Sequence, residues 1–181
     1  MSEFEPAVNY VLAQEGGLSE NPNDSGGITN FGISLRFLRT IEPERLRRYG
    51  IFEEVNEETI RGLVLDQAKF IYRGEFWDEA PFQEIECQKV CTYLFDMCVN
   101  LGVSQAVKLL QRSICAASHD RSLCRDDGLL GVGTIGYVNY FGEQLVPILM
   151  GLRAEFYRAL VAAHPHQSVN LKGWLNRCYA S

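Results

Sequence analysis

A glutamate stands at the end of the first helix that the sequence predicts, where a carboxyl group can serve as an acid. The apolar stripe of this helix, residues 4–15, consists of Phe4, Val8, Val11 and Leu12. Glu15 continues that face before Gly16-Gly17 ends the helix. Burial and the negative end of the helix dipole both disfavour a charged carboxylate, so we expect Glu15 to hold a proton near neutral pH. The alternative is a helix-end glutamate bonded to an arginine or to backbone amides of the next loop.

The segment after this helix, SENPNDSGGITNFGIS, is rich in Asn, Asp, Ser, Gly and Pro. These residues favour turns, so we expect turns and a small β-hairpin that runs into Ile28–Ile33. The segment brings a carboxylate, Asp24, and a hydroxyl, Thr29, into the region that follows Glu15.

The rest of the chain predicts a mainly α fold, because apolar residues recur every three or four positions and hardly any stretch alternates with period two. Further helices are expected at about 57–73, 86–101, 103–115 and 143–163, with a polar loop at 117–128. Asn56 has the side chain of an N-cap for the first of these. The 86–101 helix is apolar on most sides, as in the centre of a lobe, and Asp96 and Asn100 share its narrow polar strip.

Length and composition are those of a globular protein. The 181 residues, 46% hydrophobic and 22% charged, fit one domain or one domain with two lobes. A net charge of −6 argues against nucleic acid as a partner. The N-terminus lacks the apolar core of a secretory signal and no run of about 18 apolar residues occurs, so we expect synthesis in the cytoplasm and no stable membrane insertion.

The six cysteines lack the paired CxxC spacing of a zinc site, so no metal is expected. Cys87, Cys91 and Cys98 fall on one side of a predicted helix, which is typical of buried free thiols. Cys115 and Cys124 flank the polar loop, and they either stay free or pair in an oxidising compartment.

Several motifs together resemble a known family. The first begins with Glu15-Gly16-Gly17 and continues, after six residues, as DSGGITNFGI from Asp24 to Ile33. The others are Tyr72-Arg73 through Phe76-Trp77, Phe95-Asp96 with Asn100, Ala106 to Arg112, and Lys172 to Arg177. This pattern resembles glycoside hydrolase family 108, whose members are N-acetylmuramidases and include phage endolysins. The first motif is far more specific than a lone glycine-rich loop, and the resemblance covers nearly the whole chain.

The resemblance implies a lysozyme-like fold with two helical lobes and a small glycine-rich hairpin beside the catalytic glutamate. Glu15 is then the proton donor to the glycosidic oxygen, with Asp24 and Thr29 beside it. Asp24 would orient a water molecule or stabilise positive charge, and Thr29 would hold that water. For Asp24 the alternative is an Asx-turn residue that bonds only its own loop.

Five further residues are candidates for substrate binding: Asn30, Tyr72, Trp77, Asp96 and Asn100. The two aromatic rings would stack on sugars, or would serve in the core or at a hinge. Asp96 and Asn100 would meet the substrate, or would satisfy buried backbone groups. Gly26, Gly27 and Gly32 are expected to supply positive φ or a close approach to the sugar chain.

Residues 1–85 are thus expected to form the catalytic lobe, and residues 86–181 a helical lobe that resembles a peptidoglycan-binding region, within one integrated fold. The function implied is hydrolysis of the β-1,4 bond between N-acetylmuramic acid and N-acetylglucosamine. The alternatives are a non-catalytic, secretion-associated peptidoglycan-binding protein and a lytic transglycosylase. We expect a monomer without cofactor whose partner is the peptidoglycan glycan strand, reached in the periplasm or cell wall through a holin-type or other export route.

Overall fold

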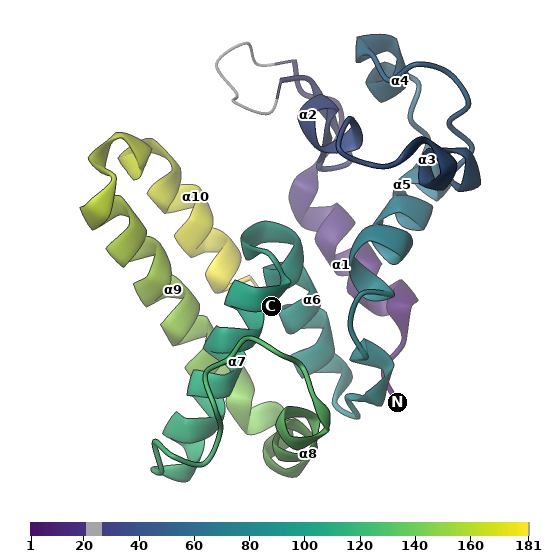
Figure 1. The fold of residues 1–181 in the computed structure, drawn as a ribbon. Coiled ribbons are helices and arrows are strands. Elements are labelled where there is room, and N and C mark those ends of the chain that lie inside the picture. Colours follow the sequence, from purple (N-terminus) through teal and green to yellow (C-terminus); the bar gives the residue numbers. More distant parts are fainter. Residues whose placement is uncertain (21–26, 181) are drawn as a thin grey trace. The chain divides into compact units, whose positions relative to one another are not determined.

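The computed structural model describes residues 1–20 and 27–180 and is mainly α-helical (Figure 1), which confirms the predicted fold class. The chain forms two compact units. Val8–Glu79 make up one, here called the hairpin unit. Met1–Ala7 together with Ala80–Ser181 make up the other, the helical unit. Within the described residues, no helix is long and apolar enough to cross a membrane.

The hairpin unit contains short elements around a two-stranded sheet. They are the greater part of α1 (Phe4–Glu15), β1 (Thr29–Asn30), β2 (Ile33–Ser34), α2 (Leu35–Leu38), α3 (Pro43–Arg48), α4 (Glu57–Arg61), α5 (Leu65–Tyr72) and the π-helix η1 (Arg73–Trp77). The bounds of α1 are those that the sequence predicts. Ser34 caps α2, since its hydroxyl oxygen accepts a hydrogen bond from the Phe37 amide at 3.1 Å. The hairpin therefore leads directly into a helix.

The prediction of a single helix at 57–73 is wrong, because the helix is interrupted between α4, which ends at Arg61, and α5, which begins at Leu65. The Asn56 cap is confirmed: its side-chain oxygen accepts from the amides of Glu58 and Thr59 at 2.8 and 3.2 Å. Gly62 ends α4, and the backbone of Val64 is extended. The side-chain oxygen of Gln67 then accepts a hydrogen bond from the Val64 amide at 3.1 Å and so caps the start of α5. The second helix thus has its own start, which apolar periodicity alone does not reveal.

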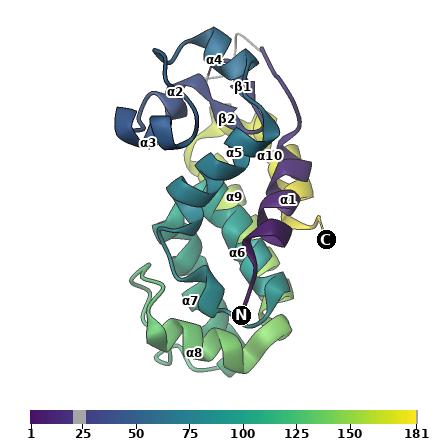
Figure 2. The same cartoon turned by 90° about the vertical axis from the view of Figure 1, so that its right-hand side faces the viewer.

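The helical unit consists of longer helices, and α8 lies across one end of it beside α7 (Figure 2). The elements are η2 (Phe82–Glu84), α6 (Gln88–Leu101), α7 (Val103–Ser118), α8 (Val132–Phe141), η3 (Gly142–Gln144), α9 (Leu145–Ala163), η4 (Pro165–Gln167) and α10 (Ser168–Cys178). The helices predicted at 86–101, 103–115 and 143–163 are confirmed with small shifts at their ends. α8 and α10 are additional, and α10 packs against α9 (Figure 1).

A buried ion cluster joins three helices of this unit. Asp96 of α6 is completely buried, and its Oδ2 accepts a hydrogen bond from Nη1 of Arg153 of α9 at 2.7 Å. Its Oδ1 accepts from Nε and Nη2 of Arg177 of α10 at 3.0 and 2.6 Å. The guanidinium carbon of Arg153 also lies 5.3 Å from the ring centre of Tyr93 and 5.8 Å from that of Tyr157. These rings offer the buried cation their negative faces.

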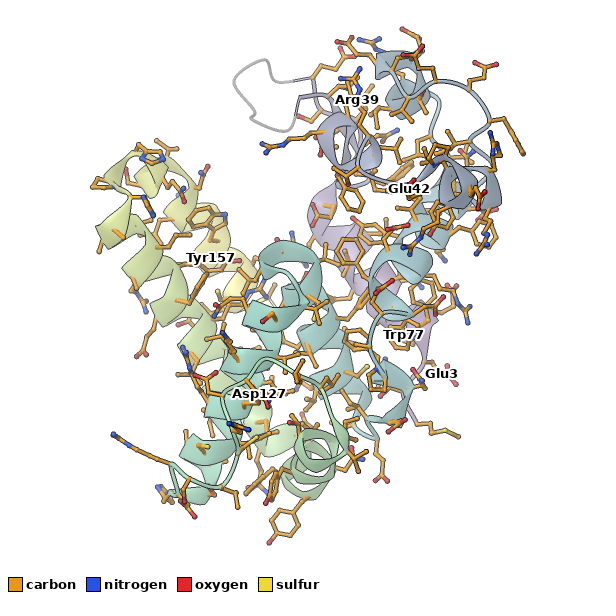
Figure 3. The ribbon with its side chains drawn as sticks, in the orientation of Figure 1. Glu3, Arg39, Glu42, Trp77, Asp127 and Tyr157 are labelled. Atoms are coloured by element: carbon orange, nitrogen blue, oxygen red, sulfur yellow. The ribbon has the colours of Figure 1, made fainter. Side chains whose placement is uncertain are left out.

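The charges in the cluster sustain one another. Burial alone would lower the pKa of Arg153, but the carboxylate of Asp96 raises it, so the guanidinium stays charged. Burial also raises the pKa of Tyr93, whose hydroxyl donates to the Cys178 carbonyl at 2.8 Å. Tyr157, labelled in Figure 3, stacks on Trp174 of α10 with ring centres 4.8 Å apart. Polar and aromatic contacts therefore hold α10 in register with α6 and α9.

The polar loop after α7 is organised by one buried side chain, Gln111. Its amide nitrogen donates to Asp127 Oδ1 at 2.7 Å and to the Leu129 carbonyl at 3.2 Å, and its oxygen accepts from the Gly128 amide at 2.9 Å. Asp127, labelled in Figure 3, also accepts from the Leu129 amide at 2.9 Å, as in an Asx-turn. The segment from Asp127 to Gly131 is therefore a loop bound to α7.

All six cysteines, which lie in the described part of the chain, are free thiols. Cys91 and Cys98 are buried, as predicted, whereas Cys87 is half-buried. Burial raises the pKa of Cys91 to about 12. Cys115 donates from its sulfur to the Cys124 carbonyl oxygen at 3.3 Å. The thiols of α6 are therefore packing groups with little thiolate character.

Replacing Asp96 with Asn should lower the free energy of unfolding by about 3–5 kcal/mol, because Arg153 would remain buried with its charge uncompensated. Urea unfolding followed by circular dichroism measures this change. Asp126→Asn is the control, since Asp126 pairs with Arg112 at the surface at 2.8 Å and its loss should cost at most about 1 kcal/mol. Equal losses in the two variants would contradict the buried cluster.

The thiols should react in an order set by burial and pKa. At pH 8 the raised pKa keeps Cys91 almost wholly protonated, and Cys98 is equally enclosed, so neither should be alkylated in the native protein. Cys87 and Cys115, which are half-buried, should be labelled first. Iodoacetamide labelling followed by peptide mass spectrometry gives the order, with urea-unfolded protein as the control. Early labelling of Cys91 would contradict the packing described for α6.

Candidate functional site

The β-hairpin turns in two residues whose backbones are both left-handed. Thr29 pairs with Ser34 and Asn30 with Ile33. Between them, Phe31 and Gly32 have φ angles of 52° and 77°, and a type I′ turn requires positive φ at both central positions. The predicted hairpin and the positive φ of Gly32 are confirmed. Phe31 is unusual there, because a bulky side chain disfavours this conformation.

A tyrosine at the end of α5 holds the Phe31-Gly32 turn of the hairpin. Tyr72, the last residue of α5, is 1% exposed, and its hydroxyl donates to the Phe31 carbonyl at 2.9 Å. Phe76 lies beside the Tyr72 ring, with ring centres 5.9 Å apart, and packs on Phe37 at 5.6 Å. A backbone in a rare conformation persists when its surroundings determine it, and these contacts do so here.

Glu15 lies against the same turn. It is the last residue of α1, which Gly16 ends with a φ of 75°. A Cβ atom built on Gly32 would stand 2.6 and 2.7 Å from Glu15 Cγ and Cδ, and 2.5 Å from the Tyr72 hydroxyl oxygen. Only a glycine lets the turn approach both side chains so closely. The sequence predicts a close approach of Gly32 to the sugar chain, and the structure shows a close approach of Gly32 to Glu15 and Tyr72.

Glu15 is half-buried, so the burial that its helical phase predicts is only partial. Its position at the final residue of α1 leaves one side of the side chain to the backbone of the turn and part of its surface exposed. A carboxyl that is fixed on one side and accessible on another can meet a ligand and exchange a proton with it.

Thr29 belongs to the strand that ties the hairpin to the chain after α1. Its amide donates to the Ser19 carbonyl at 2.9 Å, and its carbonyl accepts from the Ser19 amide at 2.8 Å. The half-buried Thr29 side chain donates to the Gly27 carbonyl at 3.3 Å. Thr29 and Glu15 thus belong to the same unit. Asp24, the other expected catalytic residue, lies outside the described residues.

Three residues expected to bind substrate are buried and hold the unit together. Asn30 is 6% exposed, and its amide donates to the Ile60 and Leu63 carbonyls, at 3.0 and 3.4 Å, where the chain breaks between α4 and α5. Tyr72 supports the turn, and Trp77 is 5% exposed. The structure therefore favours the alternative stated for the two aromatic residues, a role in the core, and it gives Asn30 a structural role as well.

Asp96 and Asn100 belong to the helical unit, whereas the residues around the hairpin belong to the other unit. Asp96 has no exposed surface, and both of its carboxylate oxygens bind arginines, so it offers nothing to a sugar. Asn100 is exposed, but its amide donates to the Asp96 carbonyl at 2.8 Å. For Asp96 the substrate-binding expectation is corrected to a structural one.

Two contributors to the site give little signal in the sequence. Ser19 carries no chemical signal beyond lying in a turn-rich segment, yet its backbone pairs with Thr29 on both sides. The Phe31 carbonyl accepts the hydrogen bond that fixes the turn, and only the Asn-Phe-Gly sequence before Ile33 hints at a two-residue turn. In the described residues, no group of three or more His, Cys, Asp or Glu side chains is placed to hold a metal ion.

The residues around Glu15 and the hairpin lie within the part of the chain that matches a family model. A family model described as Glycosyl hydrolase 108 matches residues 8–102, slightly more than half of the chain. Among chains of known structure, 12 match. One of them, described as "Structure of Brucella abortus SagA", is 25% identical, covers 97% of this chain and 88% of its own, and has a TM-score of 0.70. No curated protein matches. The mainly α, lysozyme-like fold expected from the sequence is confirmed.

Replacing Gly32 with Ala should destabilise the protein by about 2–3 kcal/mol, because the new Cβ would meet Glu15 and Tyr72 below 3 Å at a positive φ. Gly50→Ala is the matched control: its φ is 79°, but its Cβ would meet only Gln67 Nε2 at 3.4 Å. That variant should lose about 1 kcal/mol from backbone strain alone. Urea unfolding compares the two, and an equal loss would mean that the turn has room beside Glu15.

Proposed function

We propose that this chain, which belongs to the glycosyl hydrolase 108 family, is an N-acetylmuramidase with Glu15 as its general acid. Family membership makes it a glycoside hydrolase and supports peptidoglycan as its substrate. The bond proposed is the β-1,4 linkage between N-acetylmuramic acid and N-acetylglucosamine. The observation that carries the proposal is the position of Glu15. Its carboxyl lies against the turn at Gly32, within the residues that match the family model.

The position of Glu15 suits a general acid that must contact a glycan strand. The α1 helix ends at this residue, and its side chain lies against the turn at Gly32. The partly exposed carboxyl remains accessible, and a bound sugar would remove further water from it. Such a group protonates the glycosidic oxygen as the bond to the anomeric carbon breaks.

The remaining steps require a nucleophile and support for positive charge. As the glycosidic bond breaks, its electron pair passes to the leaving oxygen, which takes the proton of Glu15, and positive charge develops at the anomeric carbon. We assign to Asp24 the orientation of water or the stabilisation of that charge, and to Thr29 a hydrogen bond to the water. Water finally adds to the anomeric carbon as a hydroxyl group, and the proton that it loses restores the acid form of Glu15, so the product has a reducing end.

The proposal extends to partner and place. Residues 86–181 would bind the glycan strand as the second lobe of one fold, with the enzyme acting as a monomer and without cofactor. Its place of action would be the peptidoglycan of the periplasm or cell wall, reached through a holin-type or other export route. A role as an endolysin would follow from this activity.

Replacing Glu15 with Gln should abolish cleavage, lowering the rate at least about 100-fold, because the amide has no proton to give at neutral pH. Wild type and variant are incubated with purified sacculi, and the released fragments are identified by mass spectrometry. Wild type should release muropeptides with reducing N-acetylmuramic acid ends. Glu5→Gln, on the first turn of the same helix, is the control and should keep the wild-type rate.

Three outcomes would contradict this function. Binding of sacculi without release of fragments would favour the non-catalytic binding protein. Release of 1,6-anhydro products would identify a lytic transglycosylase. Full activity in a folded Glu15→Gln variant would remove Glu15 from the mechanism.

A further inference from the structure

We propose that Tyr72 is a positioning residue for Glu15: its hydroxyl fixes the Phe31-Gly32 turn, and the turn in its place fixes the carboxyl. This inference rests on the proposed function and assigns Tyr72 a part in it. Nothing in the structure lets Tyr72 stack on a sugar, since its ring is 1% exposed.

The first step is the hold of Tyr72 on the turn. The phenol hydroxyl donates to the Phe31 carbonyl at 2.9 Å, across 41 residues of sequence. Phe31 has a φ of 52°, a conformation that a bulky residue adopts only when its surroundings impose it. Tyr72 ends α5 and directly precedes the π-helical stretch Arg73–Trp77, so its backbone lies in regular structure, and Phe76 lies beside its ring.

The second step is the hold of the turn on Glu15. Both the Tyr72 hydroxyl oxygen and Glu15 Cδ lie within 2.7 Å of the same point, the position of a Cβ atom on Gly32. The side chain of Glu15 follows a helix that ends in Gly16-Gly17, so the local backbone restrains it weakly. The turn thus supplies a wall that the helix lacks, and any shift of Gly32 changes where the carboxyl points.

The consequence for catalysis follows from geometry. A general acid must lie within hydrogen-bond reach of the leaving oxygen, and a displacement of about 1 Å can cost about 100-fold in rate. Loss of the Tyr72 hydroxyl should therefore lower the turnover number and leave the binding of the glycan strand largely unchanged. A residue that only supports folding would instead lower the amount of folded protein.

The test compares Tyr72→Phe with Tyr49→Phe on soluble peptidoglycan fragments. Tyr49 lies in the same unit, and its hydroxyl donates to Glu75 Oε1 at 2.7 Å, so its variant loses a similar hydrogen bond away from the turn. We expect Tyr72→Phe to lower kcat about 10- to 100-fold with KM within about twofold. Tyr49→Phe should keep the kcat of the wild type, while its melting temperature should be similar to that of Tyr72→Phe. 4-Aminophenylalanine at position 72, which retains a donor, should restore part of kcat, and it replaces Tyr72→Phe if that variant does not fold.

A second measurement does not depend on activity. The carboxyl ¹³C resonance of Glu15, assigned through Glu15→Gln, should move or broaden in Tyr72→Phe and stay unchanged in Tyr49→Phe. An unchanged resonance and unchanged kcat in Tyr72→Phe would overturn the proposal, as would equal losses of kcat in both tyrosine variants. If wild type releases no fragments but the resonance moves, the proposed function fails and the positioning role stands. If wild type releases no fragments and the resonance stays unchanged in Tyr72→Phe, both the proposed function and the positioning role fail.

Discussion

The hairpin unit depends on one close approach, that of the backbone at Gly32 to the side chains of Glu15 and Tyr72. No side chain fits between them, and the φ of 77° favours glycine independently. Two unrelated requirements therefore meet at one position. The turn can occupy this place because Asn30 binds the carbonyls at the break between α4 and α5, and because Ser19 pairs with Thr29. The hairpin is short, but hydrogen bonds from three segments fix it.

The helical unit is organised by a different kind of constraint, a buried charge. Asp96 is enclosed, and it is tolerable there only because Arg153 and Arg177 satisfy both of its oxygens. Such a cluster adds little net stability compared with apolar packing, since desolvation offsets the attraction. Its geometric effect is stronger. Three helices must meet at one register for the charges to pair, and any other register would leave a charge buried alone.

Sequence patterns predict the elements of this protein better than the roles of its polar residues. Apolar periodicity and Gly16 define α1 to the residue, and turn-forming residues locate the hairpin. The break at Gly62 is missed because the apolar pattern continues across it. Asn30 and Asp96 are misjudged for another reason. Their partners, Ile60 and Arg177, lie 30 and 81 residues away, and a lone sequence does not show whether a polar group in a motif is satisfied at such a distance.

Many residues of a family motif can serve structure, while few take part in the chemistry. In the hairpin unit, Asn30 and Tyr72 contact backbone carbonyls, and Gly32 contributes the absence of a side chain. None of them needs to touch a substrate for its loss to matter, since Asn30 and Tyr72 bind the hairpin and its surroundings and Gly32 lies against Glu15. A proton donor is useful only within a few tenths of an ångström of its acceptor's line of approach. Under the proposed function, a single carboxyl at the end of α1 therefore depends on a scaffold of polar and glycine residues for its position.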